Sequence, residues 1–360
     1  MIEVNNQSPV YVKLGFKFLV IFFICFFIYT AQNILIPFAF ALLLALVLLP
    51  VVHWLEKHKF SPVLSIAIAI LLALGCIAGL IYFLSSQIAG FMGDIPSIKE
   101  HIQDHFLALQ HWVKERFNVS FQDQNAYLNQ QAEELKTSGT GYIGHTFLSI
   151  TEAAMLLILL PIYTFLLLIY RNLIKRFLFA VFKEEFGTSV KNVLAETQIM
   201  VRSYILGLLI EMIIVAAANS IGLLILGIKY AIFFGVLAAV LNLIPYIGMF
   251  TATLLTVLTT LTTSENTSDL VWIVIIFYGI HIIDVNFLMP RIVASRLRIN
   301  ALISIFGVII GGALTGISGL FLSVPAIAFI KILCDEIEGL KPWGILLGDD
   351  VAYQEKSRIS

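Results

Sequence analysis

Long apolar runs separated by short polar stretches dominate the pattern of this chain. The runs lie at residues 18–52, 61–88, 146–170, 204–226, 230–262, 270–290 and 301–333. Because about 20 apolar residues cross the hydrocarbon core as a helix, each run can hold at least one membrane helix, and the first can hold two, folded back at residues 30–33. The pattern predicts an all-α polytopic integral membrane protein, with three N-terminal membrane segments in residues 1–88 and a fourth span at 146–170.

Two polar regions divide these runs. Residues 89–145 form the larger one, and apolar side chains recur in it at helical spacing, at Ile95, Ile98, Ile102, Phe106 and Leu109. This spacing predicts an amphipathic helix that caps the spans, with a ligand-capture domain as the alternative. Residues 171–203 alternate charged and apolar positions, which predicts a pair of amphipathic surface helices.

Basic residues set the expected orientation. Within residues 171–203 they are Arg171, Lys175, Arg176, Lys183, Lys191 and Arg202. The positive-inside rule places this segment in the cytoplasm, and counting back puts the N-terminus inside and residues 89–145 outside. Four full crossings after residue 203 would put the arginines of 291–298 outside and the acidic loop 262–269 inside. Both placements contradict the rule.

Re-entrant hairpins remove this contradiction. The apolar run 230–262 is broken by Pro245, and the run 301–333 by glycines at its centre: Gly311, Gly312, Gly316 and Gly319. Each half is about 15 residues, or roughly 22 Å long, which is too short to span comfortably. We therefore expect about six full spans and two re-entrant hairpins, eight membrane segments in all. The alternative is that proline and glycine only kink ordinary spans.

The order span, hairpin, span, hairpin over residues 204–334 is an inverted-topology repeat. The first pair starts inside and the second outside, and repeats of this kind place binding sites at broken helices near the bilayer centre. We expect a transport region there, with a site between the two hairpin tips. Residues 335–360 are expected to form a cytoplasmic C-terminal tail.

Composition supports a membrane protein. Hydrophobic residues make up 59% of the 360, charged residues 12%, and the mean hydropathy is +0.96. Soluble domains contain about 25% charged residues, so a water-exposed surface cannot be built from this chain. The net charge of −1 favours neither a polybasic lipid clamp nor nucleic-acid binding.

Two carboxylates lie inside predicted spans. Glu211 is about seven residues, or roughly 11 Å, into its span, and Asp284 is about 9 Å from the same face. An ionisable group at such depth costs several kcal/mol unless it is partnered or protonated, which makes each a functional candidate. The pair could share a proton or hold a cation; buried hydrogen bonding and a subunit contact are the alternatives.

Other polar side chains lie near these acids. His281 precedes Asp284 by one turn, so that pairing with the carboxylate is favoured over a metal site, for which no further ligands have recognisable spacing. Three amides also lie in or beside the spans: Asn219, Asn242 and Asn286. We expect them to form hydrogen bonds between helices or, near a helix break, to contact substrate. Motifs of soluble enzymes are missing, so an enzyme is disfavoured and no cofactor is expected.

These segments resemble a known family. The runs LNLIPYIG, then D-x-N-x4-PR, then a glycine-rich break followed by SVP are similar to the AI-2E transporter family, also called the PerM-like family, over residues 147–332. The residues that match its motifs are Asn242, Pro245, Tyr246, Gly248, Asp284, Asn286, Pro290 and Arg291. The Y-L-x-G-Q pattern of the family reads YILGL here, and its L-H-P reads INA.

The resemblance implies a function and a location. Members are transporters of the bacterial inner membrane; some export the signal autoinducer-2, and others exchange sodium or lithium for protons. It also implies a homo-oligomer, a pentamer. We expect a secondary transporter of a small hydroxylated metabolite or a monovalent cation, with a passive pore and a non-transporting scaffold as alternatives, and with both termini in the cytoplasm.

Overall fold

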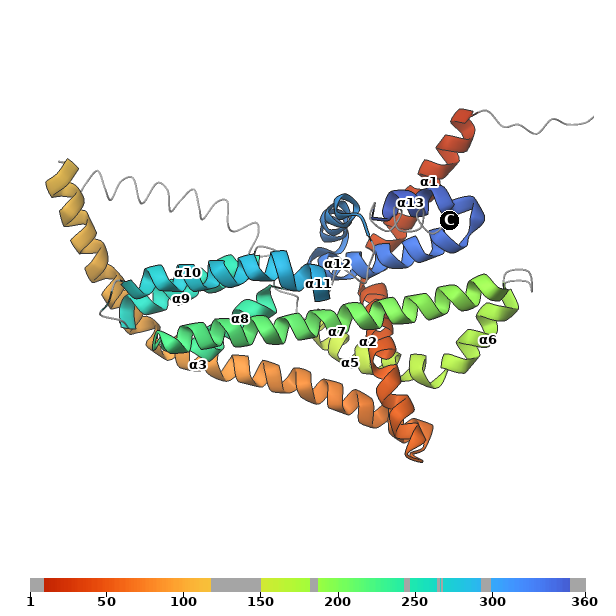
Figure 1. Ribbon diagram of the computed structural model, residues 1–360, viewed down its shortest axis with the longest axis horizontal. Helices are drawn as coiled ribbons and strands as arrows, with labels where there is room; N and C mark the ends of the chain where they lie inside the picture. The colour runs from red at the N-terminus through yellow and green to blue at the C-terminus, as the bar shows by residue number, and fades with distance from the viewer. Residues whose placement is uncertain are drawn as a thin grey trace, which may run out of the picture. The chain divides into compact units, whose positions relative to one another are not determined.

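The computed structural model describes residues 10–117, 150–181, 187–242, 247–263, 266, 268–292 and 299–349. In these residues every regular element is a helix (Figure 1). The chain divides into two compact units: the first contains Met1–Ala67, Leu156–Ser203 and Leu297–Ser360, and the second contains Ile68–Met155 and Tyr204–Arg296. The predicted all-α class is confirmed.

Five of the described helices are long and apolar enough to cross a membrane. They lie at Gln32–Lys57, Pro62–Gly93, Ser189–Ile225, Ser268–Ile292 and Ala301–Glu336, and a bent pair, Leu157–Ile169 with Arg171–Val181, raises the number to six if it is one span. The protein is therefore a multi-pass membrane protein. The count of eight membrane segments and the inverted repeat stay predictions.

The first apolar run forms two helices, as expected, but they are not folded back. Helices α1 (Val10–Thr30) and α2 (Gln32–Lys57) meet at Ala31, whose N–H donates to Phe27 O at 2.8 Å. The N–H of Leu35 in turn donates to Ala31 O at 2.9 Å, so helical hydrogen bonds run across the break. Residues 30–33 contain neither glycine nor proline, and the chain continues from α1 into α2, end to end (Figure 1).

Two other expected boundaries are absent. Helix α3 (Pro62–Phe117) joins the third span to the predicted amphipathic helix without interruption. Helix α7 (Gly187–Ile225) likewise joins the second of the predicted surface helices to the following span. In both places polar residues replace apolar ones without a change in backbone conformation, because Lys, Glu, Gln and Arg are themselves good helix formers.

The run predicted to form the first re-entrant hairpin contains two short helices, and its re-entry in the membrane stays a prediction. Helix α8 (Ala231–Leu241) and helix α9 (Ile247–Thr263) flank residues 243–246. Gly248 of α9 lies so close to the backbone of Leu241 and Asn242 that a β-carbon there would overlap it. At 1.5 Å per residue α8 is only about 16 Å long, which is too short to cross a membrane.

The second predicted hairpin is also folded back on itself. Helix α12 (Ala301–Glu336) has non-helical backbone angles at Thr315 and at Gly316, where φ is +66° and ψ is −142°. Across this break a β-carbon on Gly307 would overlap Ile327, and one on Gly311 would overlap Ser323. Such contacts require the two halves of α12 to run side by side in opposite directions.

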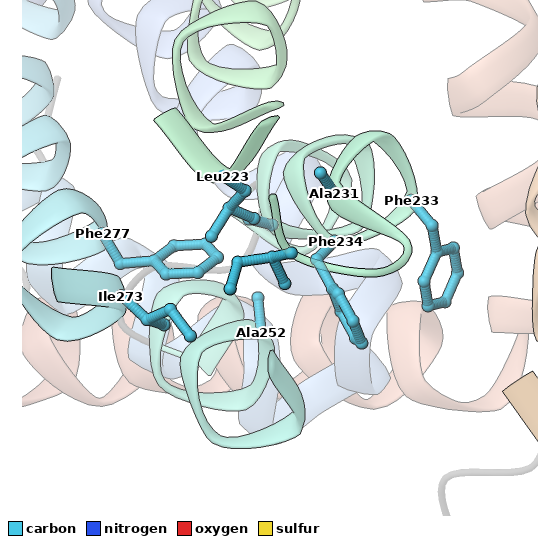
Figure 2. Close-up of a cluster of buried hydrophobic side chains, with 9 residues drawn as sticks. Leu223, Ala231, Phe233, Phe234, Ala252, Ile273 and Phe277 are labelled. Atoms are coloured by element: carbon cyan, nitrogen blue, oxygen red, sulfur yellow. The ribbon is translucent and has the colours of Figure 1, made fainter. Parts of the chain in front are cut away.

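The core of the second unit joins four helices. Leu223 of α7, Phe234 of α8, Ala252 of α9 and Ile273 of α10 (Ser268–Ile283) are fully buried and pack together (Figure 2). A β-carbon on Gly235 of α8 would overlap the Ser220 backbone, so α7 and α8 touch through small residues. Close packing of this kind holds membrane helices together where the hydrophobic effect contributes little.

The remaining elements are distributed over the two units. Most of helix α5 (Ile150–Ile169) lies in the first unit, where it precedes the short helix α6 (Arg171–Val181). In the same unit a 3-10 turn (Glu338–Leu340) and helix α13 (Lys341–Leu347) follow α12. An isolated bridge pairs Ile299 with Gly348. In the second unit, α10 continues into a π-helical turn η2 (Asp284–Leu288) and helix α11 (Met289–Ile292).

Candidate functional site

A small cavity in the second unit collects polar side chains. Its volume is about 20 Å³, which is room for one water-sized group. Its walls come from α7, α8, α9, α10 and η2, and the residues are Val215, Asn219, Ala238, Asn242, Met249, Phe277, Ile280, His281 and Asp284. Of the polar residues singled out in the sequence, four lie on this cavity: Asn219, Asn242, His281 and Asp284.

Asp284 begins a change of helix type inside the span. The N–H of Met289 donates to the Asp284 carbonyl five residues earlier, so the turn Asp284–Leu288 is π-helical. Pro290 gives the reason, because it has no N–H for the carbonyl of Asn286 and its ring crowds that carbonyl. The α-helical bonding pattern cannot pass this position unchanged. Single π-helical turns within α-helices occur frequently at functional sites.

The Asp284 side chain is buried and held by an amide. It is 3% exposed, and Asn242 Nδ2 donates a hydrogen bond of 2.9 Å to Asp284 Oδ2. Asn242 is the residue that ends α8, directly before the tip of the first hairpin. This hydrogen bond therefore connects the hairpin to the span that carries Asp284.

Glu211 lies on α7 and is 8% exposed. It is close enough to Asp284 for the charges of the two carboxyl groups to interact. One oxygen of each, Glu211 Oε2 and Asp284 Oδ1, has no hydrogen-bond donor in the described residues. Two buried carboxylates repel one another unless a proton or a cation lies between them. The arrangement thus provides a place for one positive charge.

Asn219 lines the same cavity as Asp284. Its amide Nδ2 donates to Val215 O of its own helix at 2.9 Å, so it does not join two helices as predicted. Its Oδ1 has no partner in the described residues, and the side chain is 3% exposed. The sequence predicted a hydrogen bond between helices or a substrate contact for Asn219, because its amide lies in an apolar span.

His281 lines the cavity without the predicted pairing to Asp284. One carboxylate oxygen of Asp284 accepts from Asn242 and the other has no partner, so neither takes a hydrogen bond from the imidazole. In the part of the chain that the structure describes, no three His, Cys, Asp or Glu side chains gather in a way that could hold a metal ion.

The other predicted site residues lie elsewhere. Asn286 is exposed and donates to Ile282 O of its own helix at 2.8 Å, away from the cavity. Pro290 and Arg291 are exposed, and Gly248 is buried against the end of α8. Pro245 and Tyr246 lie outside the described residues. The glycines at 311, 312, 316 and 319 belong to α12 in the first unit.

A comparison with protein families decides the identity. A sequence model described as "AI-2E family transporter" matches residues 16–339. The chain belongs to the AI-2E transporter family. This confirms the resemblance noted in the motifs of the C-terminal half, extends it over the N-terminal half, and establishes a general transport role.

Individual AI-2E relatives are similar along most of their length. One, from Bacillus subtilis (strain 168) and named "Putative transport protein YueF", is 27% identical over 318 residues, which is 85% of this chain and 84% of the relative. A second relative, from Escherichia coli (strain K12), is named "Putative transport protein YhhT". It is 24% identical over 337 residues, which is 92% of this chain and 92% of the relative. The "AI-2 transport protein TqsA" of the same organism is 25% identical and covers 89% of this chain and 90% of its own.

Proposed function

We propose that this protein is a secondary transporter of the bacterial inner membrane in which the pair Glu211–Asp284 exchanges a proton for cargo. The observation that carries the proposal is a buried carboxyl group on a small cavity, Asp284, with a second buried carboxyl group, Glu211, close to it in a unit made of apolar helices. Ionisable groups buried in membrane helices are costly, and they mark ion pathways and proton relays. A purely structural pair would have its oxygens satisfied by donors.

A single positive charge fits the geometry of this site. In one state a proton is shared between Glu211 and Asp284 while Asn242 continues to donate to Asp284 Oδ2. In the other state a monovalent cation is held by the unpartnered oxygens of Glu211 and Asp284, since hard cations prefer oxygen ligands. Exchange of one for the other couples cation movement to protons.

The size of the cavity favours ions over metabolites at this position. A volume of about 20 Å³ admits a water-sized species, whereas a small hydroxylated metabolite would require the surrounding helices to separate. TqsA is named for AI-2 transport, so export of such a metabolite is retained as a second cargo class, with the carboxyl pair serving as the proton-binding part of the cycle.

A gradient-driven flux assay tests this function. The full chain is reconstituted in sealed proteoliposomes, a pH gradient is imposed, and accumulation of sodium, of lithium and of small hydroxylated metabolites is measured in turn. The proposal predicts uphill accumulation of at least one cargo that collapses when a protonophore dissipates the gradient. A passive channel conducts only downhill, and a scaffold conducts nothing, so either of these results would replace the proposal with that alternative.

The orientation proposed for the transporter is cytoplasmic termini, with the first hairpin opening outward and the second inward. Ser264→Cys and Ser295→Cys, introduced singly after replacement of Cys25, Cys76 and Cys334, should react with an impermeant thiol reagent from opposite sides. Labelling of the Ser264 position from the cytoplasm would instead support eight full crossings.

We also propose a homo-oligomer, a pentamer, whose mass can be measured in detergent by light scattering.

A further inference from the structure

Helix α6 separates its charged and apolar residues onto two faces. At 100° per residue, Arg171, Asn172, Lys175 and Arg176 fall on one side, and Leu173, Ile174, Phe177, Leu178 and Val181 fall on the other. Phe179 is the one large apolar residue on the polar side. The helix contains three basic residues and no acidic one. An amphipathic helix with basic residues on its polar face and Phe and Leu on its apolar face is typical of a helix that lies in a membrane interface.

The apolar face of α6 is uncovered in this unit. None of its residues is buried, and Phe177 is 62%, Leu173 56% and Val181 56% exposed. Exposed apolar side chains are ordinary on a helix that crosses the hydrocarbon core, but α6 carries a charge in each of its turns up to Arg176. It therefore needs an apolar environment on one side and a polar one on the other.

The attachment of α6 gives it such an environment. It follows the apolar helix α5 after a single residue, and the chain bends by 64° between them. A span that meets the interface and then bends this strongly turns its next helix towards the membrane plane. The bend is held at its start by Arg171, whose Nη2 donates to both oxygens of Glu56 at 2.7 and 2.8 Å, at the end of α2.

We propose that α6 lies in the headgroup layer and binds anionic lipid. Its apolar face, with Phe177 at the centre, enters the acyl boundary, while Lys175 and Arg176 contact the phosphates and charged headgroups. Both side chains are exposed, and Arg171 is engaged by Glu56 and is therefore not counted among the lipid contacts. The argument for lipid over a second protein copy is charge: every charged residue of α6 is basic, and anionic headgroups attract basic residues near the surface by about 1 kcal/mol each.

The test uses the full chain in nanodiscs that contain phosphatidylcholine with about a quarter of phosphatidylglycerol. After replacement of Cys25, Cys76 and Cys334, Phe177→Cys carries a bimane label, and Asn172→Cys carries the same label on the opposite face as a control. Bromine atoms are placed on the acyl chains of one lipid at a time, and quenching of the label measures the local share of that lipid.

We expect brominated phosphatidylglycerol to quench the label at position 177 well above its bulk share, and the label at 172 to be quenched weakly by either lipid. Lys175→Gln and Arg176→Gln should each lower the preference for phosphatidylglycerol by about fivefold, following the attraction per charge at a membrane surface. Lys191→Gln removes an exposed charge of α7 and should leave the preference unchanged.

Two results would overturn the proposal. Equal quenching by both lipids in proportion to their amounts, unaffected by the glutamine variants, would show contact with lipid without recognition of charge. A label at 177 that neither lipid quenches would show that protein, such as a second copy, covers this face. Each variant is first checked for monodisperse elution, so a loss of lipid preference cannot be attributed to unfolding.

Discussion

The Asn242–Asp284 hydrogen bond is the contact on which the geometry of the site depends. A buried carboxylate with neither donor nor proton is costly, and Asn242 supplies the donor seen for Asp284 Oδ2. Of the two acids, Asp284 is held by a partner from another helix. Asn242 therefore positions Asp284.

Replacement of that donor has a measurable cost. Asn242→Ala should lower the free energy of unfolding by about 1–3 kcal/mol, the range for a buried acceptor left without its donor, and should slow gradient-driven flux. Thermal unfolding in detergent and proteoliposome uptake measure the two effects. Asn286→Ala is the matched control, because that amide is exposed and bonds its own helix; a cost as large as that of Asn242→Ala would contradict the role given to Asn242.

Sequence reasoning identified most of the residues of the site but not their contacts. Asp284 and Glu211 were predictable because charge in an apolar span is costly wherever it lies. Asn286 was grouped with these two acids, but residues two apart on a helix do not share a face. Its side chain is exposed and bonds its own helix. The Asn242–Asp284 bond could not be predicted, because it depends on where the end of α8 meets α10, and the spacing of residues along one chain does not contain that distance.

At the scale of helices, glycines determine how closely α7 and α8 approach. Gly235 lies against the backbone of Ser220, where even one β-carbon would overlap. Gly235→Ala should therefore destabilise the protein by about 1–3 kcal/mol through overpacking. Gly279→Ala provides the control in α10, because nothing lies within 4 Å of its β-carbon position. The control should be neutral or stabilising by up to about 1 kcal/mol. Chemical denaturation measures the free energy of unfolding of both variants, and an equal cost for the two would contradict the close approach of α7 and α8.

The folded-back form of α12 can be tested by a disulfide. In a straight helix positions 307 and 327 would be about 30 Å apart, but here the β-carbon position of Gly307 meets the Ile327 side chain. Gly307→Cys combined with Ile327→Cys, in a background without the native cysteines, should form an intramolecular disulfide under mild oxidation. Gly307→Cys with Ile317→Cys should form none, and an equal yield for both pairs would indicate a single continuous span.

Helix breaks were predictable where the backbone requires special residues and not elsewhere. Gly316 has a positive φ, which few residues other than glycine adopt, so the glycine cluster indicated the break correctly. The joins within α3 and α7 have no such residue. Their polarity changes while the helix continues, so a change in polarity alone does not indicate where a helix ends.

At the scale of the whole molecule, apolar runs and composition were sufficient to predict a helical multi-pass membrane protein. The C-terminal motifs indicated the family, which the match over residues 16–339 establishes. Hydropathy could not determine how the helices group, since both compact units are assembled from segments far apart in the sequence. The function that we propose rests on a different property, the burial of two acids in one of these units.

The most direct measurement is gradient-driven cargo accumulation by Asp284→Asn in sealed proteoliposomes, beside the unaltered protein and the control Asn286→Ala. Asparagine keeps the shape of Asp284 but can neither bind a proton nor balance a cation. The account predicts that uphill accumulation is lost in Asp284→Asn and kept in the control, with membrane insertion and oligomer mass unchanged in both. Normal accumulation by Asp284→Asn with an unaltered pH profile would contradict the coupling role and leave Asp284 as a structural hydrogen-bonding residue.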